Sequence, residues 1–244
     1  MERMKLLQGD CLELMKNIED QSVNMILCDL PYGTTACKWD TVIPFEPLWE
    51  QYERIIKENG AIVLFGQEPF STHLRMSNLK LYKYDWIWDK KIPSGMSYAR
   101  YQPMRQHEII SVFYKSNCYY PQKTKRDKPI KSGGMRKIDT LFNDNWVALK
   151  KNYTHKNPTS ILKCDKIRKG SIHPTQKPVA LLEYLIKTYT QENETVLDNC
   201  MGSGSTGIAC LNANRKFIGM ELDETYFGIS EKRIEEHTQQ LKLF

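Results

Sequence analysis

Asp29, Leu30, Pro31 and Tyr32 form a short segment whose residue types could carry out chemistry. They follow the apolar run Val23–Cys28, which predicts a buried strand of a parallel sheet. We therefore expect a carboxylate, a proline and an aromatic ring at the end of a strand, where open α/β sheets bind ligands. The carboxylate and a backbone carbonyl could accept hydrogen bonds there, and the ring could stack on a planar group.

A second segment with chemical potential is the glycine-rich turn Gly202-x-Gly204-x-x-Gly207. It lies between a predicted strand and a predicted helix, so its backbone could approach a cofactor closely. Glu221 ends the next predicted strand and could accept hydrogen bonds from both hydroxyls of a ribose. This pattern leaves NAD(P), S-adenosylmethionine and a purely structural turn open, whereas the lack of Gly-Lys-Ser/Thr argues against a phosphate-loop NTPase.

The position of the glycine turn in the chain narrows these choices. Only 37 residues follow Gly207, which is room for one strand and one helix. The other strands of a nucleotide-binding sheet must therefore come from upstream, and the strand that carries Asp29 comes first. This order is permuted and is unusual for a NAD-type domain.

Strands and helices alternate along most of the chain, which predicts an α/β fold with a mostly parallel sheet. Strands are predicted within residues 4–10, 23–28, 61–65, 82–88, 108–114, 194–198 and 216–221. Helices are predicted over about 11–17, 47–58, 69–78, 178–189 and 224–240, with another from the glycine turn to about 212. The pattern is lost between about 116 and 172, where we expect an inserted module.

The charge distribution sets the same segment apart. Residues 115–170 hold 15 of the 35 basic and 4 of the 29 acidic residues, which leaves 20 basic and 25 acidic residues elsewhere. This asymmetry favours a polyanionic partner that one face of the protein would meet, although a solvated lysine-rich loop would have the same composition.

Two common classes of protein are disfavoured by the sequence. The seven cysteines are scattered and form no Cys-x-x-Cys pair, so we expect reduced thiols and neither a disulfide framework nor a structural metal site. No run of 18 apolar residues occurs, and the first residues lack the apolar core of a signal peptide. We therefore expect a cytoplasmic protein that makes no contact with a membrane.

Together, the motifs resemble those of the β-class DNA amino-methyltransferases, which methylate exocyclic nitrogens of DNA bases using S-adenosylmethionine. In that family an Asp-Pro-Pro-Tyr motif comes first, followed by a target-recognition region, a His-Pro-Thr-x-Lys-Pro segment and a Gly-x-Gly turn. This chain has, in that order, Asp29–Tyr32, the basic segment, His173–Pro178 and Asp198–Ser205. The resemblance spans nearly the whole chain, and the order of the motifs is specific.

The sequence departs from the family pattern at two places. Leu30 replaces the usual first proline, but its role would be to contribute a backbone carbonyl, which leucine retains. Asn199 and Cys200 stand where the family usually has proline and phenylalanine. This second difference affects how closely the turn could pack on a cofactor.

The resemblance implies a Rossmann-like methyltransferase fold of permuted motif order, with a mostly parallel seven-stranded sheet and helices on both faces. It divides the chain into a catalytic half (1–115), an inserted target-recognition region (116–172) and a cofactor-binding half (173–244). The implied catalytic residues are Asp29, Leu30, Pro31 and Tyr32. The implied binding residues for S-adenosylmethionine are Asp10, Cys28, Thr175, Lys177, Asp198, Cys200, Gly202, Ser203, Gly204, Ser205, Glu221 and Leu222.

The implied substrate is double-stranded DNA, and the protein would lie near the nucleoid. Asp29 and the Leu30 carbonyl would accept hydrogen bonds from an adenine amino group, and Tyr32 would stack on the flipped-out base. A homodimer and a cognate restriction endonuclease are compatible with the resemblance, but the sequence carries no signal for either. The recognition sequence is also left open.

Several alternatives stay open at the level of sequence. The nearest is methylation of cytosine N4, although the family tends to have serine at the position of Asp29 for cytosine. A DNA-binding protein without activity could retain the same fold, and a NAD-dependent dehydrogenase is disfavoured by the motif order. Asp10, which resembles a residue that meets the adenine of the cofactor, could instead cap a helix.

Overall fold

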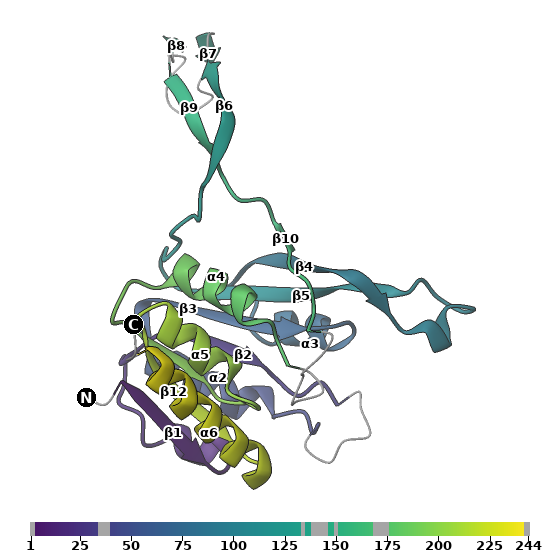
Figure 1. The fold of residues 1–244 in the computed structure, drawn as a ribbon, viewed down its shortest axis with the longest axis vertical. Coiled ribbons are helices and arrows are strands. Elements are labelled where there is room, and N and C mark those ends of the chain that lie inside the picture. Colours follow the sequence, from purple (N-terminus) through teal and green to yellow (C-terminus); the bar gives the residue numbers. More distant parts are fainter. Residues whose placement is uncertain are drawn as a thin grey trace. The chain divides into compact units, whose positions relative to one another are not determined.

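Strand β2 (Val23–Asp29) lies inside the main sheet and carries Asp29 at its carboxyl end. A computed structural model describes residues 3–33, 40–132, 135–137, 146–148, 151–167 and 176–241. Within these residues, the main sheet has the strand order β1-β12-β11-β2-β3-β5-β4-β10 (Figure 1). The other strands of this sheet are β1 (Met4–Gln8), β3 (Ile56–Gly66), β4 (Tyr82–Ser94), β5 (Arg105–Tyr114), β10 (Ile161–Lys163), β11 (Thr195–Asp198) and β12 (Lys216–Glu221).

Five adjacent strands of this sheet pair in parallel, and β4 and β10 run in the same direction as these five, so that only β5 among the eight described strands is reversed. The pairs β1–β12, β12–β11, β11–β2 and β2–β3 are parallel, whereas β5 is antiparallel to both β3 and β4. The carboxyl ends of the five parallel strands therefore meet at one edge of the sheet. Asp29, Asp198 and Glu221 are the last residues of three of these strands, so the sheet brings all three carboxylates to that edge.

Helices cover both faces of the sheet, as predicted, because successive side chains of a buried strand point to opposite faces. Met25 and Leu27 of β2 pack with residues of α4, α5 and α6, whereas Ile26 and Cys28 pack with residues of α1, α2 and α3. The helices are α1 (Cys11–Met15), α2 (Phe45–Ile55), α3 (Phe70–Ser77), α4 (Val179–Tyr189), α5 (Ser205–Asn212) and α6 (Glu224–Leu241). Within the described part of the chain, no helix has the length and apolar content that crossing a membrane requires.

The ends of some elements differ from the prediction. The helix predicted over 47–58 begins at Phe45 and ends at Ile55, where strand β3 follows at once. The adjacent isoleucines fit either periodicity, but Ile56 has an extended backbone and pairs with Val23 of β2. Pairing with a distant strand therefore decides the boundary, and the local sequence pattern does not contain that information.

The main sheet has eight strands, one more than predicted. The additional strand is β10, whose three residues pair in parallel with Ile87–Asp89 at the edge of the sheet. The backbone carbonyl of Ser160 also accepts a hydrogen bond of 2.8 Å from Ile87 N. This strand lies in the segment that we predicted to be irregular, and three residues are too few to show a periodic pattern.

Residues 121–159 form a second compact unit. Strand β6 (Thr124–Ser132) pairs with β9 (Lys151–Lys156), and β7 (Met135–Lys137) pairs with β8 (Trp146–Ala148), in both cases antiparallel. We predicted no regular structure here because the lysine-rich sequence lacks apolar alternation. The pairing uses backbone hydrogen bonds, which such a sequence can still make.

Candidate active site

A cavity of about 340 Å³ lies at the carboxyl ends of the parallel strands, within the range typical of small-molecule sites. Fourteen of the predicted site residues line it: Asp10, Cys28, Asp29, Leu30, Pro31, Tyr32, Lys177, Asp198, Cys200, Gly202, Ser203, Ser205, Glu221 and Leu222. Gly204 is not among the lining residues and instead precedes α5 with a φ of 74°. Thr175 lies outside the described residues.

Asp29 makes two close polar contacts at one end of this cavity. Its Oδ1 accepts a hydrogen bond of 2.5 Å from the Tyr32 hydroxyl, and its Oδ2 accepts one of 2.5 Å from Lys177 Nζ. The Lys177 ammonium also lies 5.1 Å from the ring centroid of Phe65, at the end of β3. Two neighbours therefore hold the carboxylate in one orientation. The sequence did not indicate that either residue would be a partner of Asp29.

Charged residues of alternating sign continue from Asp29 into the protein. Lys177 Nζ lies 3.3 Å from Glu108 Oε2, and Lys90 Nζ donates a 3.1 Å hydrogen bond to Glu108 Oε1. The Lys177 and Lys90 side chains are only 9% and 8% exposed. Such buried charges need partners, and this chain of contacts supplies them. We call Lys90, Glu108, Lys177 and Asp29 the charge cluster.

The environment of the charge cluster sets how its members ionise. Burial raises the pKa of Asp29, and the attraction of Lys177 opposes this effect without cancelling it. Burial also opposes the charged forms of Lys177 and Glu108, but their partners outweigh it. The pKa of Lys177 is therefore raised and the pKa of Glu108 is lowered. Within the charge cluster, Asp29 is consequently the carboxylate whose charge is more easily lost on acidification.

Tyr32 is half-buried next to Asp29. Its ring centroid lies 5.0 Å from that of Phe70, and Phe45 packs against Phe70 in turn at 5.7 Å. Gly33 N, one residue further on, donates a 2.9 Å hydrogen bond to Asp40 Oδ1, which holds the turn after β2. Tyr32 thus orients Asp29 through its hydroxyl, in addition to offering a ring to the cavity.

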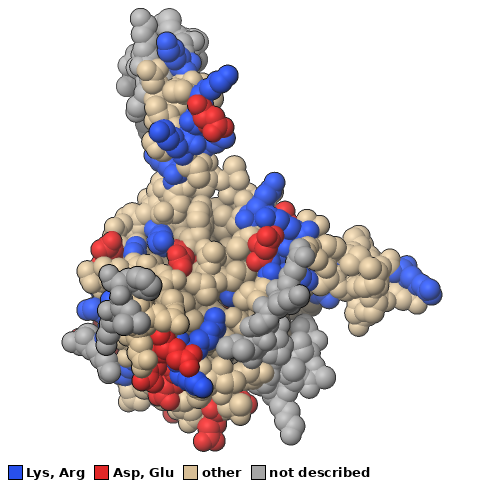
Figure 2. Space-filling view, viewed as in Figure 1, with Lys and Arg blue, Asp and Glu red and all other residues tan. Residues whose placement is uncertain are grey.

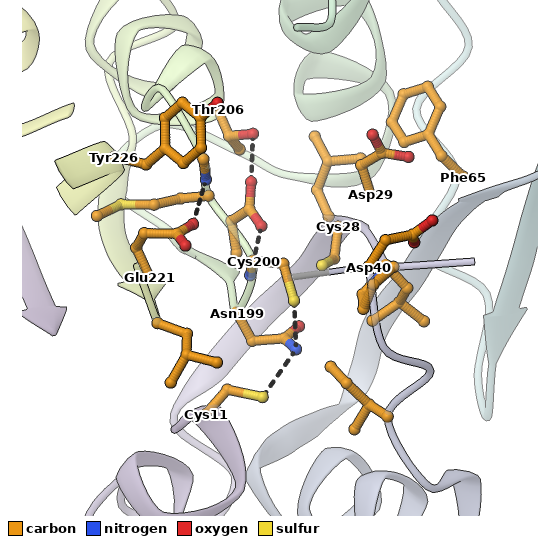
Figure 3. A pocket seen from close by; sticks show the side chains of 18 of the residues that line it. Cys11, Cys28, Asp29, Asp40, Phe65, Asn199, Cys200, Thr206, Glu221 and Tyr226 are labelled. Carbon is orange, nitrogen blue, oxygen red and sulfur yellow. Dashed lines mark hydrogen bonds between the residues drawn. The ribbon is translucent and has the colours of Figure 1, made fainter. Parts of the chain in front are cut away.

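Glu221 and Tyr226 lie on the other side of the cavity from Asp29 and Phe65 (Figure 3). Glu221 Oε2 accepts a 2.8 Å hydrogen bond from Gly202 N, and Oε1 accepts one of 3.0 Å from Asp223 N. Gly202 has a φ of 51°, a left-handed conformation that glycine adopts without strain. The glycine turn therefore fixes a carboxylate at this side of the cavity.

Asp198 lies below the glycine turn and is 4% exposed. The Thr206 hydroxyl donates a 2.6 Å hydrogen bond to Oδ2, and Cys200 N donates one of 3.1 Å to Oδ1. These bonds favour the ionised form, but burial outweighs them and raises the pKa of Asp198 to about 7. Any ligand with a positive charge near this residue would favour its carboxylate form.

Asp10 performs the structural role that we considered as an alternative. Its Oδ1 accepts a 2.8 Å hydrogen bond from Leu12 N and so caps the first turn of α1. The residue also lines the cavity. A cap and a ligand contact can coexist, because a carboxylate has two oxygen atoms that accept hydrogen bonds.

Asn199 and the cysteine thiols form the floor of the cavity in Figure 3. Asn199 Oδ1 accepts a 2.5 Å hydrogen bond from the Tyr52 hydroxyl, and Asn199 Nδ2 lies 3.5 Å from the sulfur atoms of Cys11 and Cys200. A hydrogen bond to Cys200 and burial raise the pKa of the Cys11 thiol, and burial raises the pKa of Cys28 to about 12. Through its hydrogen bond with Tyr52 of α2, Asn199 thus fixes the turn at a position where the family that the sequence resembles usually has proline.

The geometry suits a nucleoside-like ligand beside an amino-group substrate. Glu221 can accept hydrogen bonds from ribose hydroxyls, and the buried Asp198 favours a positively charged group. Asp29 and the Leu30 carbonyl can accept hydrogen bonds from an amino group at the opposite side. The residues present therefore fit S-adenosylmethionine, which combines a ribose with positively charged sulfonium and ammonium groups.

The sequence alone would not have identified Glu108 or Tyr52 as part of this arrangement, and it indicated no hydrogen-bonding role for Asn199 or Thr206 of the predicted turn. Glu108 follows a histidine at the start of a predicted strand, and it is not among the predicted site residues. Its place becomes apparent from the pairing of Trp88 with Glu108 across β4 and β5, which puts its carboxylate beside Lys177. The one signal for Glu108 in the sequence is that a carboxylate begins a predicted buried strand.

Comparisons with known proteins agree with this arrangement. A family model described as DNA methylase matches residues 23–232. The Type II methyltransferase M.HpaI of Haemophilus parainfluenzae is 26% identical over 258 residues, which cover 95% of this chain and 74% of that protein. The DNA adenine methyltransferase YhdJ of Escherichia coli K12 is 25% identical over 257 residues, which cover 96% of this chain and 83% of that protein.

The fold is also similar to that of a solved structure with its cofactor. The crystal structure of the M1.HpyAVI–SAM complex has a TM-score of 0.65 and 26% sequence identity to this chain. The match covers 94% of this chain and 99% of the other. The similarity therefore extends over both the sheet and the cavity at its edge.

Proposed function

We propose that this chain, which belongs to the N6/N4 family of DNA methylases, methylates the exocyclic N6 of adenine in duplex DNA. Its cofactor is S-adenosylmethionine, which supplies a methyl group on a positively charged sulfur when bound. The observation that carries the choice of adenine is the carboxylate of Asp29 at the target end of the cavity. Cytosine-modifying members of the family tend to have serine there.

Asp29 and Leu30 would activate the amino group of the target base. The lone pair of that nitrogen is delocalised into the ring, so the group is a poor nucleophile. The Asp29 carboxylate and the Leu30 carbonyl would accept its two N–H hydrogens and favour a pyramidal nitrogen. Tyr32 and Lys177 hold the carboxylate in place before the base arrives, so little reorganisation is needed.

Tyr32 would also hold the flipped-out base. Extrusion of a base from duplex DNA costs a few kcal/mol. Stacking on an aromatic ring recovers about 1–3 kcal/mol per base, so a stacked tyrosine would offset much of that cost. On the cofactor side, Glu221 would accept hydrogen bonds from the ribose and Asp198 would meet the methionine part.

Two alternatives have their own support. The family includes cytosine-N4 enzymes, so the same residues could act on cytosine. A DNA-binding protein without activity would share the fold, but the placement of Asp29, Tyr32 and Glu221 around one cavity favours an enzyme. Relatives such as M.HpaI are Type II methyltransferases, which supports a role in restriction–modification.

Modification-sensitive sequencing of DNA from cells that express the protein tests this proposal. We expect N6-methyladenine at one short sequence context, and no modification in cells that express the Asp29→Ala variant. Modified cytosine at a defined context would favour the alternative acceptor. Unmodified DNA with full expression of folded protein would contradict the proposed activity.

The charge cluster predicts opposite pH effects for two of its members. Lys177→Met removes the cation that lowers the pKa of Asp29, so the acid limb of the pH–rate profile should move to higher pH. Glu108→Gln removes a negative charge that raises the same pKa, so the limb should move to lower pH. We expect shifts of about one pH unit in kcat/KM for methyl transfer.

The matched control for these variants is Lys232→Met, because that side chain is 78% exposed on α6. Its profile should coincide with that of the wild type. Shifts of the same sign in the Lys177 and Glu108 variants would show that the cluster does not act through the ionisation of Asp29.

Asp198 predicts a pH dependence of cofactor binding. Because the pKa of Asp198 is about 7 without a ligand, affinity that requires its carboxylate should fall up to about tenfold per pH unit below 7. Asp198→Asn should bind about tenfold more weakly at pH 8 and lose this dependence. Calorimetric titration with S-adenosylmethionine between pH 5.5 and 8 measures both effects, and an unchanged slope in the variant would assign the dependence elsewhere.

The raised pKa of Asp198 also predicts how the stability of the cofactor-free protein depends on pH. A carboxyl group whose pKa is raised on folding stabilises the folded state below its unfolded pKa of 3.8. That contribution is lost as the pH rises through about 7. The thermal midpoint of Asp198→Asn should therefore fall less than that of the wild type between pH 5 and 7.5.

A further inference from the structure

Strands β4 and β5 extend past the rest of the main sheet. Pairing between β3 and β5 ends at Gly66 and Ile109, so the residues of β5 before Ile109 pair with β4 alone. The short helix η1 (Met96–Tyr98) lies between the two strands. We call residues 89–107 the β4–β5 arm; Figure 1 shows it as a projection of the compact unit that holds the cavity.

The base of the arm lies at the target end of the cavity. Trp88 pairs with Glu108 at this base, and Glu108 belongs to the charge cluster around Asp29. Ser94 and Arg105 form the last pair of the arm. At about 3.3 Å per residue, this pair lies about 10–20 Å from Glu108, a distance comparable to half a turn of duplex DNA.

The tip of the arm is apolar and basic. Met96, Tyr98 and Tyr101 are 73%, 58% and 87% exposed, although large apolar side chains are usually buried. Lys90 and Lys91 pair with Glu108 and Asp165 at the base of the arm, whereas residues 95–107 include Arg100 and Arg105 and no acidic residue. On the face shown in Figure 2, the outer part of the arm carries basic side chains without acidic ones.

These features fit a nucleic acid better than another protein. Three side chains on a narrow arm offer little area compared with the roughly 800 Å² per partner that stable protein interfaces bury. Positive charge without negative charge matches the phosphates of DNA. Exposed rings and methionine match the apolar side chains that other proteins insert between base steps, where they unstack the duplex.

We propose that the β4–β5 arm enters duplex DNA beside the target base and that Met96, Tyr98 and Tyr101 stabilise the gap left when this base is extruded. The proposal rests on the proposed function, because it requires a flipped-out target. Arg100 and Arg105 would contact flanking phosphates. The arm therefore acts in extruding the base, separately from the chemistry at Asp29.

A comparison of paired and unpaired target adenines separates a role of the arm in base extrusion from a purely structural role. The Tyr98→Ala/Tyr101→Ala double variant of the full chain should methylate a fully paired duplex at least about tenfold more slowly than the wild type. With the same target adenine placed opposite an abasic site, the base is already unpaired and extrusion is easier. On that duplex we expect the variant to reach the wild-type rate within about threefold.

Two matched variants complete the design. Tyr98→Phe/Tyr101→Phe keeps both rings and should behave like the wild type on both duplexes. Met76→Ala truncates an equally exposed apolar side chain on α3 and should change neither rate. Binding of S-adenosylmethionine should be the same in all variants.

The outcomes distinguish the arm from the proposed function. A wild-type chain that methylates neither duplex would refute the proposed function and the arm proposal with it. A wild-type chain that methylates both duplexes, together with an alanine variant that is equally slow on both or slow on neither, would refute the arm proposal alone. Altered oligomeric mass in the alanine variant with unchanged rates would instead assign the tip to a protein contact.

Discussion

Asp29→Ala should lower the rate of methyl transfer to DNA roughly 1,000-fold while S-adenosylmethionine still binds. The variant loses the carboxylate that would accept a hydrogen bond from the target amino group. Removal of one preorganised electrostatic group commonly has an effect of about 100- to 1,000-fold. The larger value is expected because Lys177, freed from Asp29, would present a donor to a substrate group that also donates.

The double variant Asp29→Ala/Lys177→Met tests the contribution of the unpaired lysine. If the exposed ammonium adds to the defect, the double variant should be faster than Asp29→Ala, and the two effects should not be additive. Asp20→Ala is the control, because that side chain is 70% exposed and outside the cavity. Single-turnover transfer of a labelled methyl group measures the rate, and near-normal turnover of Asp29→Ala would contradict the assignment.

Replacing residues 121–159 with a short glycine–serine linker should weaken DNA binding at least about 100-fold near physiological salt. This unit contains 10 basic and 3 acidic residues, a balance of +7. The described residues that line the cavity all belong to the other unit, so the binding of S-adenosylmethionine should persist. We propose that this unit is the target-recognition region, whose positive side chains position the duplex through phosphates.

The boundaries of this deletion follow the contacts of the main sheet. Tyr120 N donates a 2.8 Å hydrogen bond to the Thr188 carbonyl, and strand β10 pairs with β4. A deletion that extends from 121 to 167 would remove β10 and disturb the edge of the sheet. Ending it at 159 leaves both contacts in place.

A variant that keeps residues 121–159 in place separates the effect of their charge on DNA binding from the effect of removing the unit. Four lysines of this unit, in β6, in β9 and just before β6, would be replaced by glutamine: Lys123, Lys125, Lys128 and Lys156. The substitutions should lower both the affinity for DNA and the salt dependence of that affinity. The slope of log K against log salt should fall by about one for each phosphate that the variant no longer neutralises. Fluorescence anisotropy with labelled duplex measures it, and an unchanged slope would place the DNA-binding surface outside this unit.

The elements of the main sheet were predictable because their apolar runs are long and bounded by turns. Val23–Cys28 and the glycine turn at Gly202 both lie where the sequence placed them. Strand β10 and the pairing of β6 with β9 were not predictable, because short or lysine-rich strands show no apolar period. Their positions depend on partners that are distant in the sequence.

The site was predictable in part for a similar reason. The motifs indicated that Asp29, Asp198 and Glu221 end parallel strands, and the sheet brings them to one edge. The charge cluster required the register between β4 and β5 and the approach of Lys177 to β2, which no local pattern encodes. We predicted that Lys177 binds the cofactor; it lines the cavity, and its contact with Asp29 was not predicted.

The identity of the methylated base tests the proposed function without an intermediate step. Purified protein would be incubated with duplex DNA and S-adenosylmethionine carrying an isotopically labelled methyl group, and the digested nucleosides would be separated by mass spectrometry. We predict the label in N6-methyldeoxyadenosine, and its absence with Asp29→Ala. Label confined to N4-methyldeoxycytidine, or no label in either nucleoside with folded protein that binds its cofactor, would contradict adenine-N6 methylation by this chain.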